Sequence, residues 1–97
     1  MIDNVNLMLN AAYCAGYCEE NVWQLLGDLE LAEVPSKAVI VTNANASVLY
    51  FQQRAAPDSY LCWDYHVFAI SADFVLDLDH RDRAPMQRAE YLAGSFP

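Results

Sequence analysis

The heptapeptide Tyr17-Cys18-Glu19-Glu20-Asn21-Val22-Trp23 decides the fold of the first part of this chain. From Cys18 to Leu29, apolar residues recur at spacings of three and four, which is the period of an α-helix. Glu19 and Glu20 follow in the predicted first turn, where the positive end of the helix dipole favours acidic side chains. The heptapeptide therefore predicts a helix that begins near Cys18 and packs its apolar side against the rest of the protein.

The rest of the chain predicts short elements around this helix. Residues 1–12 are expected to form a helical lead-in, followed by a break at residues 14–16. Gly27 is predicted to end the main helix, unless the helix frays on to Glu33. Beyond it, β-branched and aromatic runs between turn residues predict strands. The strands are expected at residues 38–41, 48–51 (running on to 54), 60–70 and 74–79, and a last helix at residues 86–92.

This order of elements indicates an α+β protein. The N-terminal helices are expected to pack on an antiparallel β-sheet of about four strands. The chain has no internal repeats, linkers or low-complexity tracts. Residues 1–97 are therefore predicted to form a single domain.

The composition indicates a folded, acidic protein. Hydrophobic residues make up 56% of the 97 residues, and 13 acidic residues against 5 basic ones give a formal net charge of −8. Without a basic patch, binding to nucleic acid or to an anionic membrane surface is not expected. Three cysteines are an odd number and the start lacks the basic region of a signal peptide, so a reducing, cytoplasmic location is predicted. The oligomeric state stays open, with a monomer as the expectation.

A histidine and an aspartate are predicted to face each other across the last hairpin. With a turn centred between residues 71 and 72, His66 lies directly opposite Asp77, with Cβ atoms about 4.5–5.5 Å apart. The same register places Asp79 opposite Asp64. An aspartate beside an imidazole fixes the tautomer of the ring and stabilises its protonated form. The alternative is a buried histidine whose polar atoms a carboxylate simply satisfies.

Cys18 supplies the third part of a cysteine nucleophile site. A thiol in the first helical turn is near unpaired N–H groups and the helix dipole, which favour the thiolate. Together with His66 and Asp77 it provides the nucleophile, base and orienting acid of acyl-transfer chemistry. The alternative is that Cys18 is a small buried hydrophobic residue, as most free cysteines are.

A zinc site is the competing chemistry. Cys14, Cys18, Cys62 and His66 are all residues that bind zinc. On one strand, however, Cys62 and His66 would lie about 13 Å apart, too far to share an ion. We therefore expect no metal and no cofactor.

Four motifs resemble those of the protein N-terminal glutamine amidohydrolases, and they occur in the same order. The likeness runs from about Tyr13 to Asp79, and Tyr91 to Phe96 is similar to a following helix of the family. The resemblance implies a core similar to the papain-like and transglutaminase-like folds. The motifs are Tyr17-Cys-Glu-Glu-Asn-Val-Trp23, Gln52-Gln53-Arg54, Trp63-Asp-Tyr-His-Val67 and Asp77-Leu-Asp79.

The resemblance also implies an activity and its residues. Members of this family convert an N-terminal glutamine of a protein or peptide to glutamate with release of ammonia, a step in the N-degron pathway. Their catalytic cysteine, histidine and aspartate match Cys18, His66 and Asp77 in this sequence. The mechanism so implied passes through a thioester on the cysteine and needs no cofactor.

Selection of a chain terminus requires an acidic or carbonyl group near the substrate α-ammonium. Glu19, Glu20 and Asp64 are the candidates for this contact, although the two glutamates also complement the helix dipole. Trp63 and Tyr65 alternate with His66 and are predicted to pack against the opposite face of the sheet.

Other functions are compatible with the same residues. Family members continue beyond the motifs found here, so the chain is expected to be a minimal or truncated form. A cysteine peptidase or a transglutaminase-like acyl transferase would use the same chemistry. A non-catalytic interaction domain that retained the fold is the alternative from another class.

Overall fold

The computed structural model describes residues 18–82 and 85–97, and it confirms the α+β class. The predicted helical lead-in at residues 1–12 and the break at residues 14–16 lie outside the described residues. The elements are α2 (Cys18–Leu31), β1 (Lys37–Val41), β2 (Val48–Gln53), β3 (Ala56–Trp63), β4 (His66–Ser71), β5 (Phe74–Leu76), β6 (Met86–Gln87) and α3 (Arg88–Ser95).

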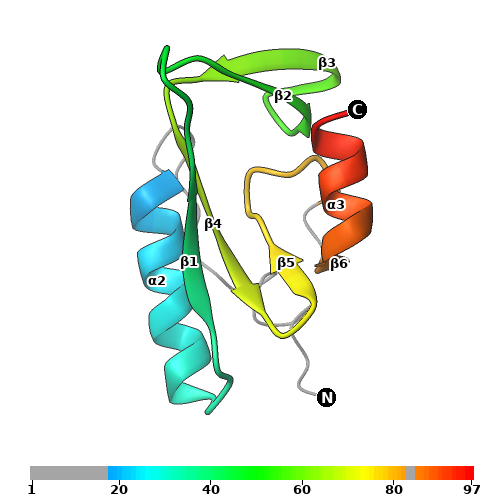
Figure 1. The fold of residues 1–97 in the computed structure, drawn as a ribbon. Helices are drawn as coiled ribbons and strands as arrows, with labels where there is room; N and C mark the ends of the chain where they lie inside the picture. Colours follow the sequence, from blue (N-terminus) through cyan, green and yellow to red (C-terminus); the bar gives the residue numbers. More distant parts are fainter. Residues whose placement is uncertain (1–17, 83–84) are drawn as a thin grey trace.

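The strands form two antiparallel sheets (Figure 1). One has four strands in the order β1-β4-β5-β6, and the other is the β2–β3 hairpin. The single strand predicted at residues 60–70 was therefore wrong. A bend at residues 64–65 divides it into β3 and β4, which pair with different strands. Because Asp64 and Tyr65 are both exposed there, the chain crosses between the sheets without burying unpaired backbone groups.

Two clusters of buried side chains cover the two faces of the four-stranded sheet. Side chains alternate along β4, so Val67 and Ala69 face α2 while Phe68 faces β2 and α3. Figure 1 shows the two helices on opposite sides of this sheet. No helix in residues 18–82 and 85–97 has the length and apolar character that a membrane crossing needs. The α2 cluster contains Val22, Leu25, Leu29, Val34, Val67, Ala69, Leu76 and Leu78.

Helix α2 continues through Gly27 and ends in a backbone motif at Glu33. Glu33 has a φ of 60°, its N–H donates to the Glu30 carbonyl, and the Val34 N–H donates to the Leu29 carbonyl at 2.8 Å. This is a Schellman motif with glutamate in the position that glycine usually takes. The predicted stop at Gly27 was wrong because Leu25 and Leu29 are both fully buried. Their burial stabilises the helix by more than the roughly 1 kcal/mol that one interior glycine costs.

The β4–β5 hairpin has a different register from the predicted one. Its turn is Ala72-Asp73, with Ala72 at a φ of 51°, and Ser71 pairs with Phe74. The pairing has slid by two residues, so each side chain keeps its predicted face while its partner changes. Strand β5 ends at Leu76, so the predicted cross-strand pairs of His66 with Asp77 and of Asp64 with Asp79 do not form.

Candidate active site

His66 and Asp77 are in contact although they are not a cross-strand pair. His66 is the first residue of β4, and Asp77 directly follows β5. The Nε2 atom of His66 lies 3.0 Å from Oδ2 of Asp77, and both side chains are buried. The two-residue slide kept both on one face of the sheet, and this places them diagonally within reach.

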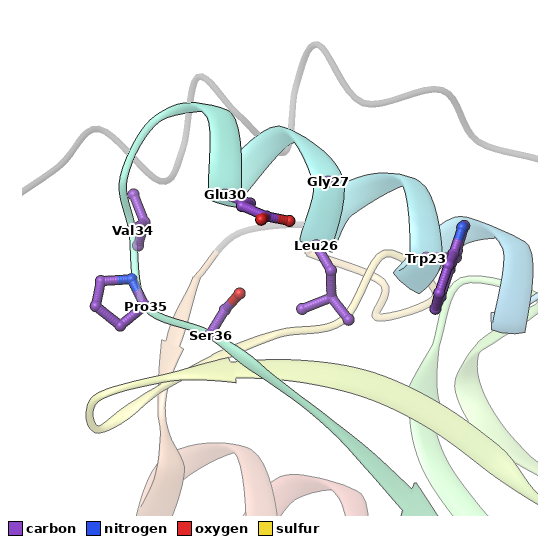
Figure 2. A pocket seen from close by; sticks show the side chains of 7 residues that line it. All are labelled: Trp23, Leu26, Gly27, Glu30, Val34, Pro35 and Ser36. Carbon is purple, nitrogen blue, oxygen red and sulfur yellow. The ribbon is translucent and has the colours of Figure 1, made fainter.

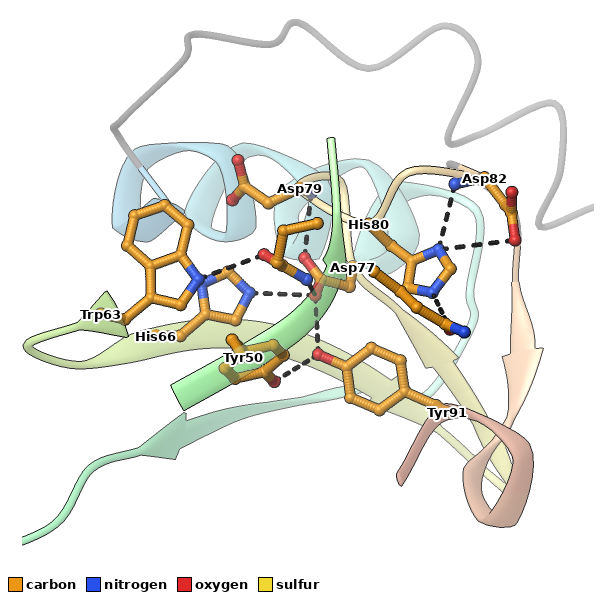
Figure 3. A network of polar contacts seen from close by, with 10 residues as sticks. Tyr50, Trp63, His66, Asp77, Asp79, His80, Asp82 and Tyr91 are labelled. Carbon is orange, nitrogen blue, oxygen red and sulfur yellow. Dashed lines mark hydrogen bonds and ion pairs between the residues drawn. The ribbon is translucent and has the colours of Figure 1, made fainter. Parts of the chain in front are cut away.

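Asp77 accepts hydrogen bonds from four groups (Figure 3). Oδ2 accepts from His66, from Nε2 of Gln53 at 3.2 Å and from the Tyr91 hydroxyl at 2.6 Å. Oδ1 accepts from the backbone N–H of Asp79 at 2.9 Å. Burial alone would raise the pKa of Asp77, but the bond and charge of His66, helped by Tyr91 and the Asp79 N–H, lower it below its usual range. Asp77 is thus held as a carboxylate inside the protein.

Trp63 covers the ring of His66. The two rings stack with centroids 5.1 Å apart and an interplanar angle of 14°. The indole N–H donates to Oε1 of Gln53 at 3.2 Å, and Gln53 in turn donates to Asp77. The expectation that Trp63 packs on the opposite face was wrong, because the bend after β3 turns Trp63 back over His66. Tyr65 contacts Glu19 of α2, on the side of the sheet away from His66, as expected. The stack fixes the plane of the imidazole.

A pair of tyrosines completes the buried network. The Tyr91 hydroxyl from α3 contacts the Tyr50 hydroxyl from β2 as well as Asp77, and both tyrosines are fully buried. Tyr50 also meets the His66 ring edge-on, with centroids 4.9 Å apart. Sequence reasoning missed Tyr50, Tyr91 and Gln53 as parts of this site. Gln53 and Tyr91 did lie in segments that resemble family motifs, and this was the available signal.

His80 is a second buried histidine in a different electrostatic setting. Its Nδ1 accepts from the backbone N–H of Asp82 at 3.1 Å, so Nε2 carries the hydrogen and faces Oε1 of Gln52 at 3.3 Å. Burial lowers the pKa of His80, and the charges of Asp77 and Asp82 only partly oppose this. His80 is therefore held neutral, whereas His66 has a carboxylate within hydrogen-bonding distance.

The predicted nucleophile begins helix α2, but its side chain lies outside the described part of the structure. Its neighbour can be placed, because the Tyr65 hydroxyl donates to Oε1 of Glu19. Tyr65 precedes His66 and Glu19 follows Cys18, so this bond joins the helix start to the start of β4. The predicted ammonium-binding residues Glu19, Glu20 and Asp64 are all exposed.

The same network contains a geometry that a metal could use. Ligand atoms of His66, Asp77 and Asp79 lie within 4.8 Å of one another, and all three residues are buried. Asp77, however, already accepts four hydrogen bonds, one of them from Nε2 of His66. The arrangement suits a proton-holding pair better than a metal. The zinc set proposed as competing chemistry places Cys62 on β3 with its side chain exposed, whereas His66 is buried on β4.

Two hollows lie along α2, the first against residues 34–36 and the second against β1, and no residue of the buried network lines either of them. The first has a volume of about 490 Å³, and Glu30 is its one ionisable lining residue (Figure 2). It therefore offers no set of catalytic or metal-binding side chains. The second, of about 450 Å³, reaches the start of α2 and includes Glu19 and Glu20 beside Trp23, Ile40 and Val67. Only the second hollow approaches the predicted nucleophile.

Comparison with known proteins agrees with the motifs. The sequence matches the N-terminal glutamine amidase family over residues 13–97. The chain belongs to this family. Curated relatives named protein N-terminal glutamine amidohydrolase, from Drosophila erecta and Drosophila melanogaster, are each 35% identical over 98 aligned residues. The alignments cover 90% of this chain and 48% of each relative, so the chain spans about half the length of the relatives it matches.

The matched range of the N-terminal glutamine amidase family contains every residue of the buried network. It also contains Cys18 and Tyr91, and it includes the stretch between Asp79 and Tyr91 that the separate motifs did not cover. The family assignment is thus confirmed over most of the chain. The likeness to papain-like and transglutaminase-like folds stays a prediction.

Proposed function

We propose that this chain hydrolyses the side-chain amide of an N-terminal glutamine, giving glutamate and ammonia. The observation that carries the proposal is the buried contact of 3.0 Å between His66 and Asp77. The proposal is supported by membership of the N-terminal glutamine amidase family and by the hydrogen bond between Tyr65 and Glu19. Asp77 contacts Nε2 of His66, and in the proposed mechanism the other ring nitrogen, Nδ1, exchanges a proton with the Cys18 thiol.

The proposed reaction has two halves. The Cys18 thiolate attacks the amide carbon, and the imidazolium of His66 gives its proton to the departing nitrogen, so that ammonia leaves and a thioester remains. His66 then takes a proton from water, whose oxygen attacks the thioester carbon and releases the glutamate product and the thiol. Backbone N–H groups at the start of α2 are suited to stabilise the oxyanion of both steps.

An acidic residue at the helix start would select a free chain terminus. We propose Glu19 for this role, because it directly follows Cys18 and the Tyr65 hydroxyl donates to its carboxylate. Glu20, next to Glu19, and Asp64, two residues before His66, are also exposed and remain secondary candidates. We assign the following residue of the peptide to the hollow of about 450 Å³ that Glu19 lines. A reducing, cytoplasmic location and a role in the N-degron pathway belong to the same proposal.

A substrate panel tests the reaction and its alternatives. The full chain is incubated with a peptide that begins with glutamine, and ammonia release and peptide mass are followed. Cys18→Ala is expected to abolish turnover, whereas Cys62→Ala, which alters an exposed cysteine on β3, is expected to retain it. Equal activity of Cys18→Ala and wild type would exclude the proposed mechanism.

The same panel separates related chemistries. An N-acetylated glutamine peptide lacks the ammonium and is expected to react poorly, and Glu19→Gln is expected to raise KM for the free peptide. Conversion of internal glutamine would indicate the transglutaminase-like alternative, and cleavage of the backbone would indicate a peptidase. A well-folded wild type with none of these activities would favour the interaction-domain alternative.

A further inference from the structure

The C-terminal helix supplies the shortest of the four hydrogen bonds to the buried carboxylate of Asp77. Tyr91 comes from α3 and its hydroxyl lies 2.6 Å from Oδ2 of Asp77, compared with 3.0 Å for His66 and 3.2 Å for Gln53. These three donors come from α3, β4 and β2, so three separate elements converge on one oxygen (Figure 3). A charge-assisted hydrogen bond of this kind is about twice as strong as a neutral one.

The direction of the tyrosine hydrogen bonds follows from the number of hydrogens. Ionised Asp77 can only accept, so the single hydroxyl hydrogen of Tyr91 points to it. The contact between the two hydroxyls must then use the hydrogen of Tyr50. The order is Tyr50 to Tyr91 to Asp77, and each bond polarises the next. Burial and the nearby charge of Asp77 raise the pKa of Tyr91, so this hydroxyl remains a donor.

Ring packing holds the Tyr91 hydroxyl in place. Its ring lies 5.0 Å from that of Phe68, 5.9 Å from that of His80 and 6.3 Å from that of Tyr50, measured between centroids. The residue is completely buried, so docking of α3 carries the hydroxyl to Asp77.

We propose that Tyr91 is a positioning residue for the proposed amidase reaction, with Tyr50 orienting its hydroxyl. The inference rests on the proposed function. The Tyr91 hydroxyl holds Asp77 in the orientation that meets Nε2 of His66, and it shares the negative charge that Asp77 presents to the imidazolium. Without this donor, Asp77 would be less fixed and would attract the imidazolium proton more strongly.

Two other titratable groups lie near the His66–Asp77 pair. Among the described residues, Asp79 has a carboxylate oxygen within 4.8 Å of ligand atoms of both His66 and Asp77. His80 lies next to Tyr91, with ring centroids 5.9 Å apart, and the charge of Asp77 partly opposes the lowering of the His80 pKa by burial. Asp79 and His80 are both retained in a Tyr91→Phe variant, so a change in the pKa of His66 would result from loss of the Tyr91 hydroxyl.

The test compares Tyr91→Phe with wild type in the full chain. For a glutamine peptide, kcat is expected to fall about 10-fold with little change in KM, since the lost bond is to a charged group that does not contact substrate. The alkaline limb of the kcat profile should move to higher pH, because the imidazolium keeps its proton longer. Tyr60→Phe, which alters a tyrosine exposed on β3, is the matched control and should change neither.

A readout that does not need turnover separates this inference from the proposed function. Titration of the histidine ring signals by NMR is expected to show a higher pKa for His66 in Tyr91→Phe than in wild type. Tyr50→Phe should give a smaller shift of the same sign, and it carries the test if Tyr91→Phe does not fold. Unchanged His66 titration in the folded variants would make Tyr91 a core residue only. A shift in a protein without turnover would retain the inference about the pair and refute the amidase reaction.

Discussion

The two faces of the four-stranded sheet are buried in different ways. On the α2 face, aliphatic side chains such as Leu25 and Leu29 pack on β4 and β5, and Asn21 is the one buried polar residue among the described residues of this helix. On the α3 face, aromatic residues surround a carboxylate, an imidazole and two tyrosine hydroxyls. The first face is what a small domain needs for stability, since burial of a leucine contributes about 1.5–3 kcal/mol.

The polar face has a cost that the apolar face avoids. A buried carboxylate loses its hydration, and hydrogen bonds to it must replace what water supplied. Four hydrogen-bond donors replace the lost hydration of Asp77. Its partner His66 lies under the stacked ring of Trp63. Stability alone does not require such an arrangement, because an apolar core of similar volume is often at least as stable. The contrast supports the proposal that one face maintains the fold and the other holds the His66–Asp77 pair for catalysis.

Removal of the carboxylate should give the largest effect. In Asp77→Ala, kcat for a glutamine peptide is expected to fall about 100- to 10,000-fold, because His66 loses the group that orients it. The unfolding free energy should also fall by about 1–3 kcal/mol, since the buried donors lose their acceptor. Steady-state kinetics and urea unfolding measure the two effects. Asp73→Ala, in the exposed β4–β5 turn, is the control, and similar losses there would remove the distinction between the two faces.

Truncation on the apolar face should change stability alone. Leu25→Ala is expected to lower the unfolding free energy by about 2–5 kcal/mol, through lost burial and the cavity left behind. The pH profile of kcat should keep its shape as long as the protein is folded. Leu31→Ala on the same helix, where the side chain is 86% exposed, should cost little. A pH profile that moved in Leu25→Ala would show that the two faces are not independent.

The smallest expected effect concerns the second histidine. Because the folded-state pKa of His80 is lowered from its ordinary 6.5, its contribution to stability is present above that value and is lost as pH falls through the folded pKa. His80→Asn can still accept from the Asp82 N–H without titrating, so its unfolding free energy should fall less than that of wild type on acidification. Urea unfolding at a series of pH values measures this. If the unfolding free energies of the two proteins fell equally with pH, residues other than His80 would be responsible for the acid sensitivity.

The sequence predicted the elements better than it predicted their ends. Periodicity located α2, and β-branched runs located most strands, because both signals come from burial of one side of an element. The turn at Ala72 was not foreseeable, since this residue adopts a positive φ angle that sequence patterns assign to glycine. For the same reason the helix end at Glu33 was only the alternative to a stop at Gly27. The predicted face of Asp77 was right despite the wrong register, because a slide of two residues preserves the alternation of side chains.

The buried network could be predicted only in part from the sequence. The hairpin made His66 and Asp77 neighbours through local geometry, so their contact could be predicted. Tyr50 and Tyr91 are 41 residues apart and meet only when α3 docks beside the β2–β3 hairpin. No local pattern encodes that meeting, because it depends on how the two sheets and the helix pack together.

The reactivity of Cys18 tests the central claim most directly. At about pH 6, where a thiol with an ordinary pKa of about 8.5 is protonated, iodoacetamide should alkylate Cys18 faster than Cys14 or Cys62, as followed by peptide mass mapping. The advantage of Cys18 should disappear in His66→Asn. Equal rates for the three cysteines in wild type, or an unchanged Cys18 rate in His66→Asn, would contradict a thiolate paired with the His66–Asp77 site.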